Sequence, residues 1–207
     1  MSSGHFLTLA VLTLLAYLIG GLPFGYWFVR LRLGKDIRTM GSGNIGATNV
    51  YRTAGNRAGL IVLLLDIFKG LLAVVIAYVT AHGDALALAL AASAAVVGHC
   101  YPVFLNLKGG KAVACFIGAF GFISPLALLA DAVVFVITVA MSRYISLGSI
   151  IGAAVFPLFF WWIDHPALPL LYASIFAGIL IIYRHHANII RLRTGTENSF
   201  SIRKKAA

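Results

Sequence analysis

Residues 41–49 read Gly-Ser-Gly-Asn-Ile-Gly-Ala-Thr-Asn, a polar run between two long apolar segments, 6–28 and 58–80. Apolar segments of this length are typical of membrane-spanning helices, which need about 20 consecutive apolar residues. The polar run therefore predicts a connection at the membrane surface. The apolar segments on either side predict the fold class, an all-α, polytopic integral membrane protein.

The same run has the chemistry of an anion site. Its three glycines can adopt positive φ angles, and its asparagine, serine and threonine side chains supply hydrogen-bond donors. Backbone N–H groups in such a loop can form an anion-binding nest. Arg38, Arg52 and Arg57 lie close in sequence and favour an anion, most simply a phosphate. The alternative is a flexible loop with basic flanks.

Composition supports the membrane assignment. Of the 207 residues, 61% are hydrophobic and only 11% are charged, and the mean hydropathy is +0.96. Ordinary soluble domains have about 25% charged residues. We expect one membrane domain over residues 1–207. The net charge of +10 is better explained by cytoplasmic Lys and Arg and by anionic lipid or substrate than by nucleic acid, which we do not expect as a partner.

Apolar runs predict about seven spans, near residues 6–28, 58–80, 85–104, 112–122, 125–141, 147–163 and 167–184. The fourth run is short for a full crossing. It could be tilted, begin inside the preceding glycine loop, or not cross at all. The first run has no basic region before it, so we expect a retained anchor and not a cleaved signal peptide.

Charge placement predicts an orientation. With the N-terminus outside and seven crossings, nearly every Lys and Arg falls in the cytoplasmic stretches 29–57, 105–111, 142–146 and 185–207. The predicted outer connections hold no Lys or Arg, as the positive-inside rule requires. The sequence therefore predicts an outside N-terminus, a cytoplasmic C-terminus, and all polar motif loops on the cytoplasmic side.

A second polar stretch reads Gly-His-Cys-Tyr-Pro at 98–102 and continues with Lys-Gly-Gly-Lys at 108–111. The spacing does not match a P-loop, but the two lysines can bring compact ammonium groups to a phosphate. The alternative is that they contact lipid headgroups at a helix end. His99 lies at or inside a span, where a structural hydrogen bond is at least as expected as catalysis.

A third polar stretch reads Arg-His-His-Ala-Asn at 184–188 and runs on to Arg191 and Arg193. Helical spacing places His185, Asn188 and either Arg191 or Leu192 on one face, so the histidine and the asparagine could point into a site together. The alternative is a basic end cap that complements the helix dipole.

Two further pairs are expected to be structural. Asp66 and Lys69 are three residues apart inside the second span and predict an internal ion pair, because an unpaired charge there costs about 2.5–3.5 kcal/mol. Cys100 and Cys115 have no metal-binding spacing and are expected to be buried free thiols. The sequence predicts neither a metal nor a cofactor.

The three motifs together, at residues 41–50, 98–111 and 184–189, resemble the bacterial membrane acyl-phosphate:glycerol-3-phosphate acyltransferase family. The resemblance covers essentially the whole chain. It implies a seven-helix enzyme of the bacterial cytoplasmic (inner) membrane, in phospholipid biosynthesis. Such an enzyme transfers a fatty acyl group from acyl phosphate to the sn-1 hydroxyl of glycerol 3-phosphate, giving lysophosphatidic acid and phosphate.

The resemblance also implies roles for individual residues. The acyl-phosphate head would be held by Ser42, Gly43, Asn44 and Thr48. Glycerol 3-phosphate and the reacting centre would be surrounded by Arg52, Lys111, Ser146, His185 and Asn188. Among these, the catalytic residues would be Ser42, Lys111 and His185.

The chemistry of the residues agrees with this implication. Two phosphorylated ligands require several cations and N–H donors in one place, and an acyl phosphate is already activated, so positioning and oxyanion stabilisation suffice. Another glycerolipid acyltransferase family, which uses acyl-CoA, has a His-x-x-x-x-Asp pattern, and none of the six histidines here begins such a pattern.

The rival hypotheses are a transporter for a phosphorylated solute and a purely structural membrane subunit. A transporter should also have polar residues on the outer face, and a structural subunit leaves the motifs unexplained.

Overall fold

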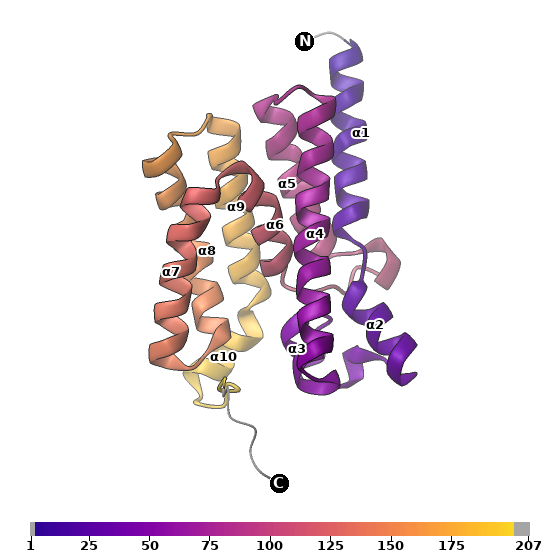
Figure 1. The fold of residues 1–207 in the computed structure, drawn as a ribbon, viewed down its shortest axis with the longest axis vertical. Coiled ribbons are helices and arrows are strands. Elements are labelled where there is room, and N and C mark those ends of the chain that lie inside the picture. Colours follow the sequence, from indigo (N-terminus) through magenta and orange to yellow (C-terminus); the bar gives the residue numbers. More distant parts are fainter. Residues whose placement is uncertain (1–2, 201–207) are drawn as a thin grey trace.

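The computed structural model describes residues 3–200, and within that range it contains helices and no strand (Figure 1). The elements are α1 (Ser3–Gly20), α2 (Phe24–Leu33), η1 (Ile37–Thr39), α3 (Ala47–Ala54), α4 (Asn56–Thr80), α5 (Ala85–Cys100), η2 (Val103–Leu105), α6 (Val113–Ile123), α7 (Pro125–Ser142), α8 (Ile145–Asp164), α9 (Leu168–Arg184) and α10 (His186–Arg193). The all-α prediction is confirmed.

Within residues 3–200, five helical segments are long and apolar enough to cross a membrane: Ser3–Leu33, Asn56–Thr80, Ala85–Leu105, Pro125–Ser142 and Ile145–Asp164. A sixth is formed by α9 and α10 if this pair, bent by 55°, counts as one span. α6 has 11 residues and is therefore about 16 Å long, roughly half of the 30 Å hydrocarbon core. The prediction of a multi-pass membrane protein is confirmed, whereas the exact count of seven is not.

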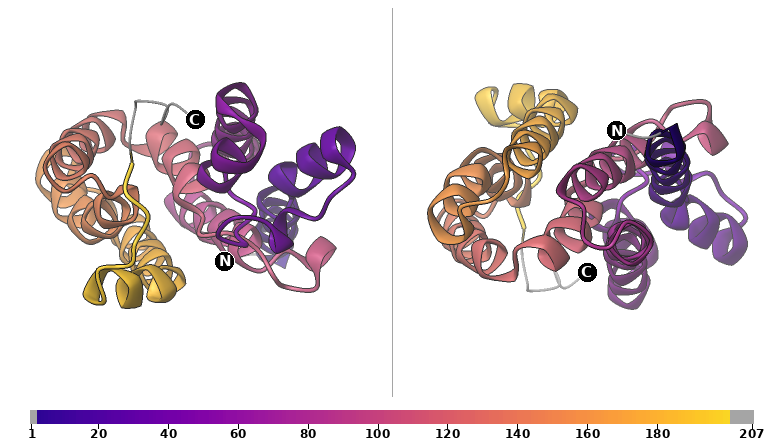
Figure 2. Two further views of the ribbon diagram at one scale, coloured as in Figure 1. Left: turned by 90° about the horizontal axis from the view of Figure 1, so that it is seen from below. Right: turned by 90° about the horizontal axis from the view of Figure 1, so that it is seen from above.

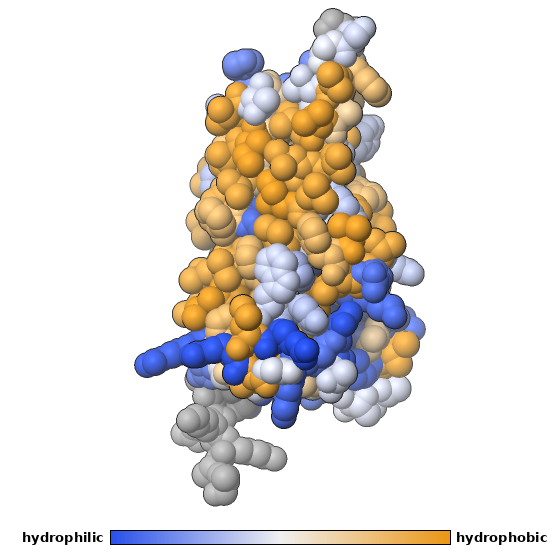
Figure 3. Space-filling model, turned by 90° about the vertical axis from the view of Figure 1, so that its right-hand side faces the viewer, coloured by the Kyte–Doolittle hydropathy of each residue, from blue (hydrophilic) through white to orange (hydrophobic). Residues whose placement is uncertain are grey.

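The surface separates into an apolar band and a polar end. Figure 3 shows apolar residues over most of the long axis and hydrophilic residues gathered toward the end at which α2 lies. α7 contributes strongly to the band, because only 6% of its most apolar window is buried inside the protein. An apolar band of this kind is the surface that a bilayer covers.

The helices form two groups. One group joins α1, α2, α3, α4, α5 and α6, with close packing of α4 on α6 and of α1 on α5. The other group joins α7, α8 and α9. The two groups meet where α9 packs on α5 and where α6 leads into α7, and the views along the long axis in Figure 2 separate them clearly. A site between the groups is therefore built from both halves of the sequence.

The first predicted span, near 6–28, corresponds to the apolar segment Ser3–Leu33, which is broken into two helices. α1 ends at Gly20 and α2 begins at Phe24. The break leaves the carbonyl of Leu22 without its helical partner, and Lys69 Nζ donates to that carbonyl over 2.7 Å. Lys69 also pairs with Asp66 Oδ1 over 2.8 Å, with the two side chains 2% and 3% exposed. The predicted internal ion pair is thus confirmed, and it also fixes the break.

Small residues hold α6 against α4. A Cβ atom at Gly118 would lie 1.8 Å from the carbonyl oxygen of Ile67, and one at Gly70 would lie 2.0 Å from that of Cys115. Only glycine permits this backbone approach. The loop before α6 folds back on the end of α5, where Gly110 N–H donates to the carbonyl of His99. α6 begins at Val113, so the fourth predicted span does not begin inside the preceding glycine loop.

Candidate active site

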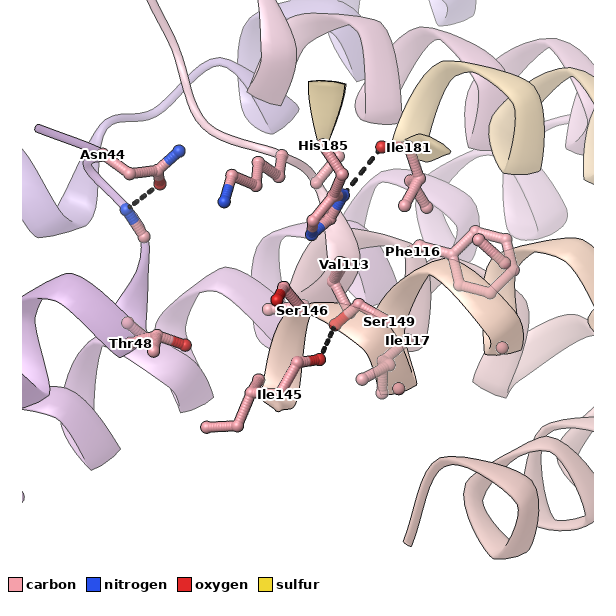
Figure 4. Close-up of a pocket in the computed structure, with 18 of the residues that line it drawn as sticks. Asn44, Thr48, Val113, Phe116, Ile117, Ile145, Ser146, Ser149, Ile181 and His185 are labelled. Atoms are coloured by element: carbon pink, nitrogen blue, oxygen red, sulfur yellow. Dashed lines mark hydrogen bonds between the residues drawn. The ribbon is translucent and has the colours of Figure 1, made fainter. Parts of the chain in front are cut away.

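A cavity of about 450 Å³ lies between the two helix groups and brings the three sequence motifs together. Figure 4 shows Asn44 and Thr48 on one side of it, with Ser146 and His185 opposite. Eight of the nine candidate site residues line the cavity: Ser42, Asn44, Thr48, Arg52, Lys111, Ser146, His185 and Asn188. Gly43 is not a lining residue and lies in the loop between Ser42 and Asn44.

The loop of the first motif is held by Asn49, a residue for which the sequence analysis gave no separate role. Its buried side chain donates through Nδ2 to the carbonyls of Met40 (2.9 Å) and Asn44 (2.8 Å). Its Oδ1 accepts the N–H of Ser42 over 2.9 Å. Asn49 therefore fixes the loop from inside, as a buried amide with its donors and acceptor satisfied should.

The loop has the predicted backbone conformation, although its amides are only partly available to an anion. Gly41 and Gly43 have φ angles of +55° and +71°. The N–H of Gly43 donates to Met40 and that of Gly46 donates to the Asn44 side chain. Donors for an anion therefore come chiefly from the start of α3, where no described side chain caps the helix at Gly46. A helix N-terminus of this kind binds phosphate well.

Lys111 lines the cavity and is placed to bring its ammonium group to a phosphate, as expected for at least one of the two lysines. Its Nζ donates to Asn188 Oδ1. Burial lowers the pKa of Lys111 to about 8, and neighbouring arginines add to this effect while Glu197 opposes it. The next residue, Ala112, has φ +62°, a conformation that costs an L-residue roughly 1–2 kcal/mol. The backbone is therefore strained at Ala112, directly after the residue that reaches into the site.

Lys108, the other lysine of the second motif, is exposed and does not line the cavity. The Gly-Gly turn between the two lysines is held by Arg184, whose Nε and Nη2 donate to the carbonyls of Gly110 (3.1 Å) and Gly109 (2.9 Å). The second motif thus supplies one ammonium group, that of Lys111, to the site. Arg184 of the third motif holds the Gly-Gly turn in place and has a structural role.

His185, Asn188 and Arg191 all line the cavity, as their spacing suggested, and the chain is bent at His185. α9 ends at Arg184, α10 begins at His186, and their axes differ by 55°. His185 Nδ1 contacts the carbonyl of Ile181 at 2.8 Å. Because a carbonyl only accepts, Nδ1 carries the proton and Nε2 is the acceptor. Burial and the charge of Lys111 lower the pKa of His185 to about 4, so the ring is neutral at pH 7.

Glu197 is the site residue that sequence reasoning missed. Its Oε1 accepts from Ser146 Oγ (2.9 Å) and Asn188 Nδ2 (2.7 Å), and its Oε2 accepts from Arg191 Nε (2.7 Å). Burial opposes ionisation of this carboxyl, but the three hydrogen bonds outweigh it and hold the pKa of Glu197 below its ordinary value. One feature of the sequence could have pointed to this residue: Glu197 is the only glutamate in the chain.

His99 lines the cavity beneath the Gly-Gly turn, and a Cβ at Gly110 would lie 2.3 Å from its Nε2. Its Nδ1 is 3.9 Å from Asp66 Oδ1 and has no hydrogen-bond partner among residues 3–200. The expected structural hydrogen bond of the His99 ring is therefore absent from the described part of the chain. Within that part, no three His, Cys, Asp or Glu side chains are grouped to hold a metal ion.

Beyond the polar end, the cavity continues between apolar helix faces. Its walls there are formed by α4, α6, α7 and α8. They include Leu63, Ile117, Phe116, Leu128, Phe135 and Ala153. The cavity therefore combines cations, amides and hydroxyls at one end with an apolar lining at the other.

Comparisons with known proteins agree with this arrangement. The family profile described as "Glycerol-3-phosphate acyltransferase" matches residues 10–195. A protein of that name from Syntrophotalea carbinolica is 48% identical over 192 residues, which is 92% of this chain and 96% of the relative. One from Geobacter sulfurreducens is 46% identical over 190 residues, with the same two coverages.

Two solved structures have the same fold. Both are crystal structures of PlsY, an integral membrane glycerol 3-phosphate acyltransferase. The glycerol 3-phosphate form has a TM-score of 0.88 and 40% identity, covering 93% of this chain and 96% of that one. The lysophosphatidic acid form has a TM-score of 0.85 and 39% identity, covering 93% and 95%. The chain belongs to the glycerol-3-phosphate acyltransferase family.

Proposed function

We propose that this protein transfers a fatty acyl group from acyl phosphate to the sn-1 hydroxyl of glycerol 3-phosphate, and that the cavity is the active site. One observation carries the proposal: a single cavity joins a cationic, amide-rich end to an apolar continuation between membrane-spanning helices. An acyl phosphate has this same polarity, with a dianionic head and an alkyl chain. The rival transporter lacks a comparable feature, because the motifs converge on one cavity at one end of the bundle.

The polar end of the cavity has two facing sides, which suit the two phosphorylated substrates. Ser42, Asn44 and Thr48, with the loop geometry of Gly43, would hold the acyl-phosphate head at the start of α3. Glycerol 3-phosphate would lie on the facing side, among Arg52, Lys111, Ser146, His185 and Asn188. The apolar walls would receive the acyl chain.

The reaction requires no covalent enzyme intermediate. The sn-1 hydroxyl oxygen attacks the acyl carbonyl carbon, a C–O bond forms, and the C–O bond to phosphate breaks. The hydroxyl proton passes to a phosphate oxygen of the donor, which leaves as inorganic phosphate. Ser42 and Lys111 stabilise the negative charge that develops during the step. His185 accepts a hydrogen bond from the hydroxyl through Nε2 and orients it, since its low pKa makes it a weak base.

A donor competition assay tests the proposal. Purified protein is incubated with labelled glycerol 3-phosphate and, in separate reactions, acyl phosphate, acyl-CoA or acyl carrier protein loaded with the same chain. We expect labelled lysophosphatidic acid from acyl phosphate alone. Labelled product from acyl-CoA and none from acyl phosphate would overturn the proposed donor.

The proposed location is the bacterial cytoplasmic membrane, with the N-terminus outside and the active site on the cytoplasmic side. Single cysteines at Ser2 and Ala206, both outside the described residues, should be labelled from opposite sides of intact cells. The native Cys100 and Cys115 are buried and should give little background. If both termini were labelled from the same side, the chain would cross the membrane an even number of times. The proposed orientation requires an odd number, so this result would contradict it.

Gly43→Ala should damage transfer more than Ser42→Ala. A Cβ at Gly43 would lie 3.1 Å from the carbonyl oxygen of Arg38, and the φ of +71° costs an L-residue about 1–2 kcal/mol. The substitution therefore displaces the loop that presents Ser42 and Asn44, whereas Ser42→Ala removes one hydroxyl and keeps the loop. At saturating glycerol 3-phosphate we expect the order wild type, Ser42→Ala, Gly43→Ala, with the KM for acyl phosphate raised most in the glycine variant.

Gly34→Ala is the matched control for Gly43→Ala. Gly34 has φ +66° at the end of α2, and a Cβ there meets nothing within 4 Å. Gly34→Ala carries the same positive-φ penalty at a position outside the cavity. It should therefore lower the free energy of unfolding slightly and leave the KM for acyl phosphate unchanged. A Gly43→Ala variant that uses acyl phosphate as well as wild type would show that this run is an ordinary connection.

A further inference from the structure

Asp131 is an acidic residue in the apolar part of the cavity and has no role in the chemistry above. It lies in α7, a membrane-spanning helix, is half-buried, and lines the cavity. Its Oδ1 is inaccessible to solvent and has no hydrogen-bond partner among the described residues. The motifs at the polar end do not include it.

The facing helix is shaped to accept this carboxyl group. A Cβ atom at Gly152 of α8 would lie 3.1 and 3.2 Å from the two carboxyl oxygens of Asp131. Any larger residue at Gly152 would crowd the carboxyl group or push it toward the cavity. The neighbours Leu128, Ala132 and Phe135 on α7 are apolar and line the same region, so none of them can pair with Asp131.

Asp131 lies at a depth that an acyl chain would reach. Gly152 follows Ser146 by six residues on α8, which is about 9 Å along the helix axis. A long alkyl chain that starts at the polar end would pass this point, whereas a short chain would stop before it. Polar groups at membrane depth are costly and generally mark a functional site.

We infer that Asp131 is a specificity-determining residue for the acyl chain. Oδ2 of the half-buried Asp131 is not closed off from solvent as Oδ1 is. An unsubstituted alkyl segment beside Oδ2 removes water from it and supplies no hydrogen bond, so chains long enough to pass Asp131 bind less well than the apolar walls alone would allow. A chain with a hydroxyl group at that depth satisfies the carboxyl group and is preferred, because a buried polar group discriminates strongly against a ligand that leaves it unpaired. The inference rests on the proposed function, since the chain arrives as acyl phosphate.

The test compares kcat/KM for palmitoyl phosphate and for hexanoyl phosphate, which is too short to reach Asp131, in wild type and in Asp131→Leu. Asp131→Leu should raise the palmitoyl-to-hexanoyl ratio by about tenfold, the effect of removing one unpaired polar group. Asp131→Asn keeps a polar group of the same shape and should keep the wild-type ratio. Val133→Leu changes an exposed position of α7 that does not line the cavity and should also leave the ratio unchanged.

A ratio in Asp131→Leu equal to that of wild type would overturn the inference. If this variant does not fold, wild type assayed with palmitoyl phosphates hydroxylated at successive mid-chain carbons decides. One hydroxylated isomer should be used better than the unsubstituted chain, and no preference at any carbon would contradict the role of Asp131. Failure of the proposed function is distinguishable, because wild type would then transfer neither palmitoyl nor hexanoyl from phosphate.

Discussion

Lys111→Ala should abolish acyl transfer, with kcat/KM for glycerol 3-phosphate lowered by at least about 10²- to 10³-fold. Lys111 Nζ is the one ammonium that the second motif brings into the cavity, and it lies beside Asn188 of the third motif. In this water-poor position it would contact a phosphate oxygen and stabilise the developing charge. Steady-state kinetics on purified protein would measure the loss.

Lys108→Ala is the matched control, because it removes an exposed lysine from the same Gly-Gly turn without touching the cavity. It should retain nearly full activity. Lys111→Arg should also be poor, since a planar guanidinium does not occupy the place of a compact ammonium. Near-normal turnover of Lys111→Ala, in protein that elutes as wild type, would remove Lys111 from the site.

The pH dependence should report the same lysine. Burial lowers its pKa to about 8, so the cationic form that binds a phosphate dianion predominates below that pH and is lost above it. kcat/KM for glycerol 3-phosphate, which reports the free enzyme, should therefore fall as the pH rises above about 8. The residual activity of Lys111→Arg should not show this decline. A flat wild-type profile from pH 7 to 9.5, after subtraction of spontaneous acyl-phosphate hydrolysis, would contradict the assignment.

The sequence predicted the features that depend on local pattern. Long apolar runs indicated the all-α membrane class, and the spacing of Asp66 and Lys69 indicated their ion pair. The three motifs were found because separate polar runs stand out in an apolar chain, whereas the individual site residues, among them Ser146 outside the motifs, were assigned by the resemblance to the acyltransferase family. Orientation and the single domain over 1–207 stay predictions.

Features that depend on packing were not predictable in the same way. The break between α1 and α2 lies in an apolar stretch, so hydropathy continues across it, and only Gly20, Gly21 and Pro23 signal a helix end. No glycine or proline near His185 indicates the bend there. Two partners of Glu197, Asn188 and Arg191, are near it in sequence, but Ser146 of α8 is 51 residues away. A contact at that separation leaves no periodic pattern in the sequence.

Glu197→Gln should cost both stability and activity. The carboxylate accepts from Ser146, Asn188 and Arg191, and two of these partners face glycerol 3-phosphate in the proposed site. A glutamine has one acceptor oxygen, and its NH₂ group would meet a donor where the second oxygen now lies. At least one donor, Nε of the partly buried Arg191 or a buried donor of Ser146 or Asn188, is then left unpaired, which costs about 1–3 kcal/mol where the donor is buried. We expect a lower thermal midpoint in detergent and a kcat/KM for glycerol 3-phosphate reduced by about 10²-fold or more.

Asp36→Asn is the matched control for Glu197→Gln, because Asp36 also pairs with an arginine but is less buried and accepts from no residue of the cavity. Arg38 Nη2–Asp36 Oδ2 is 2.6 Å and Arg191 Nε–Glu197 Oε2 is 2.7 Å, with arginine side chains 33% and 32% exposed. The carboxylate side chains are 28% exposed for Asp36 and 3% for Glu197. An exposed pair contributes little, so Asp36→Asn should leave the midpoint and kinetics near those of wild type. Equal effects of the two substitutions would mean that Glu197 acts as an ordinary surface charge and does not position Ser146 and Asn188.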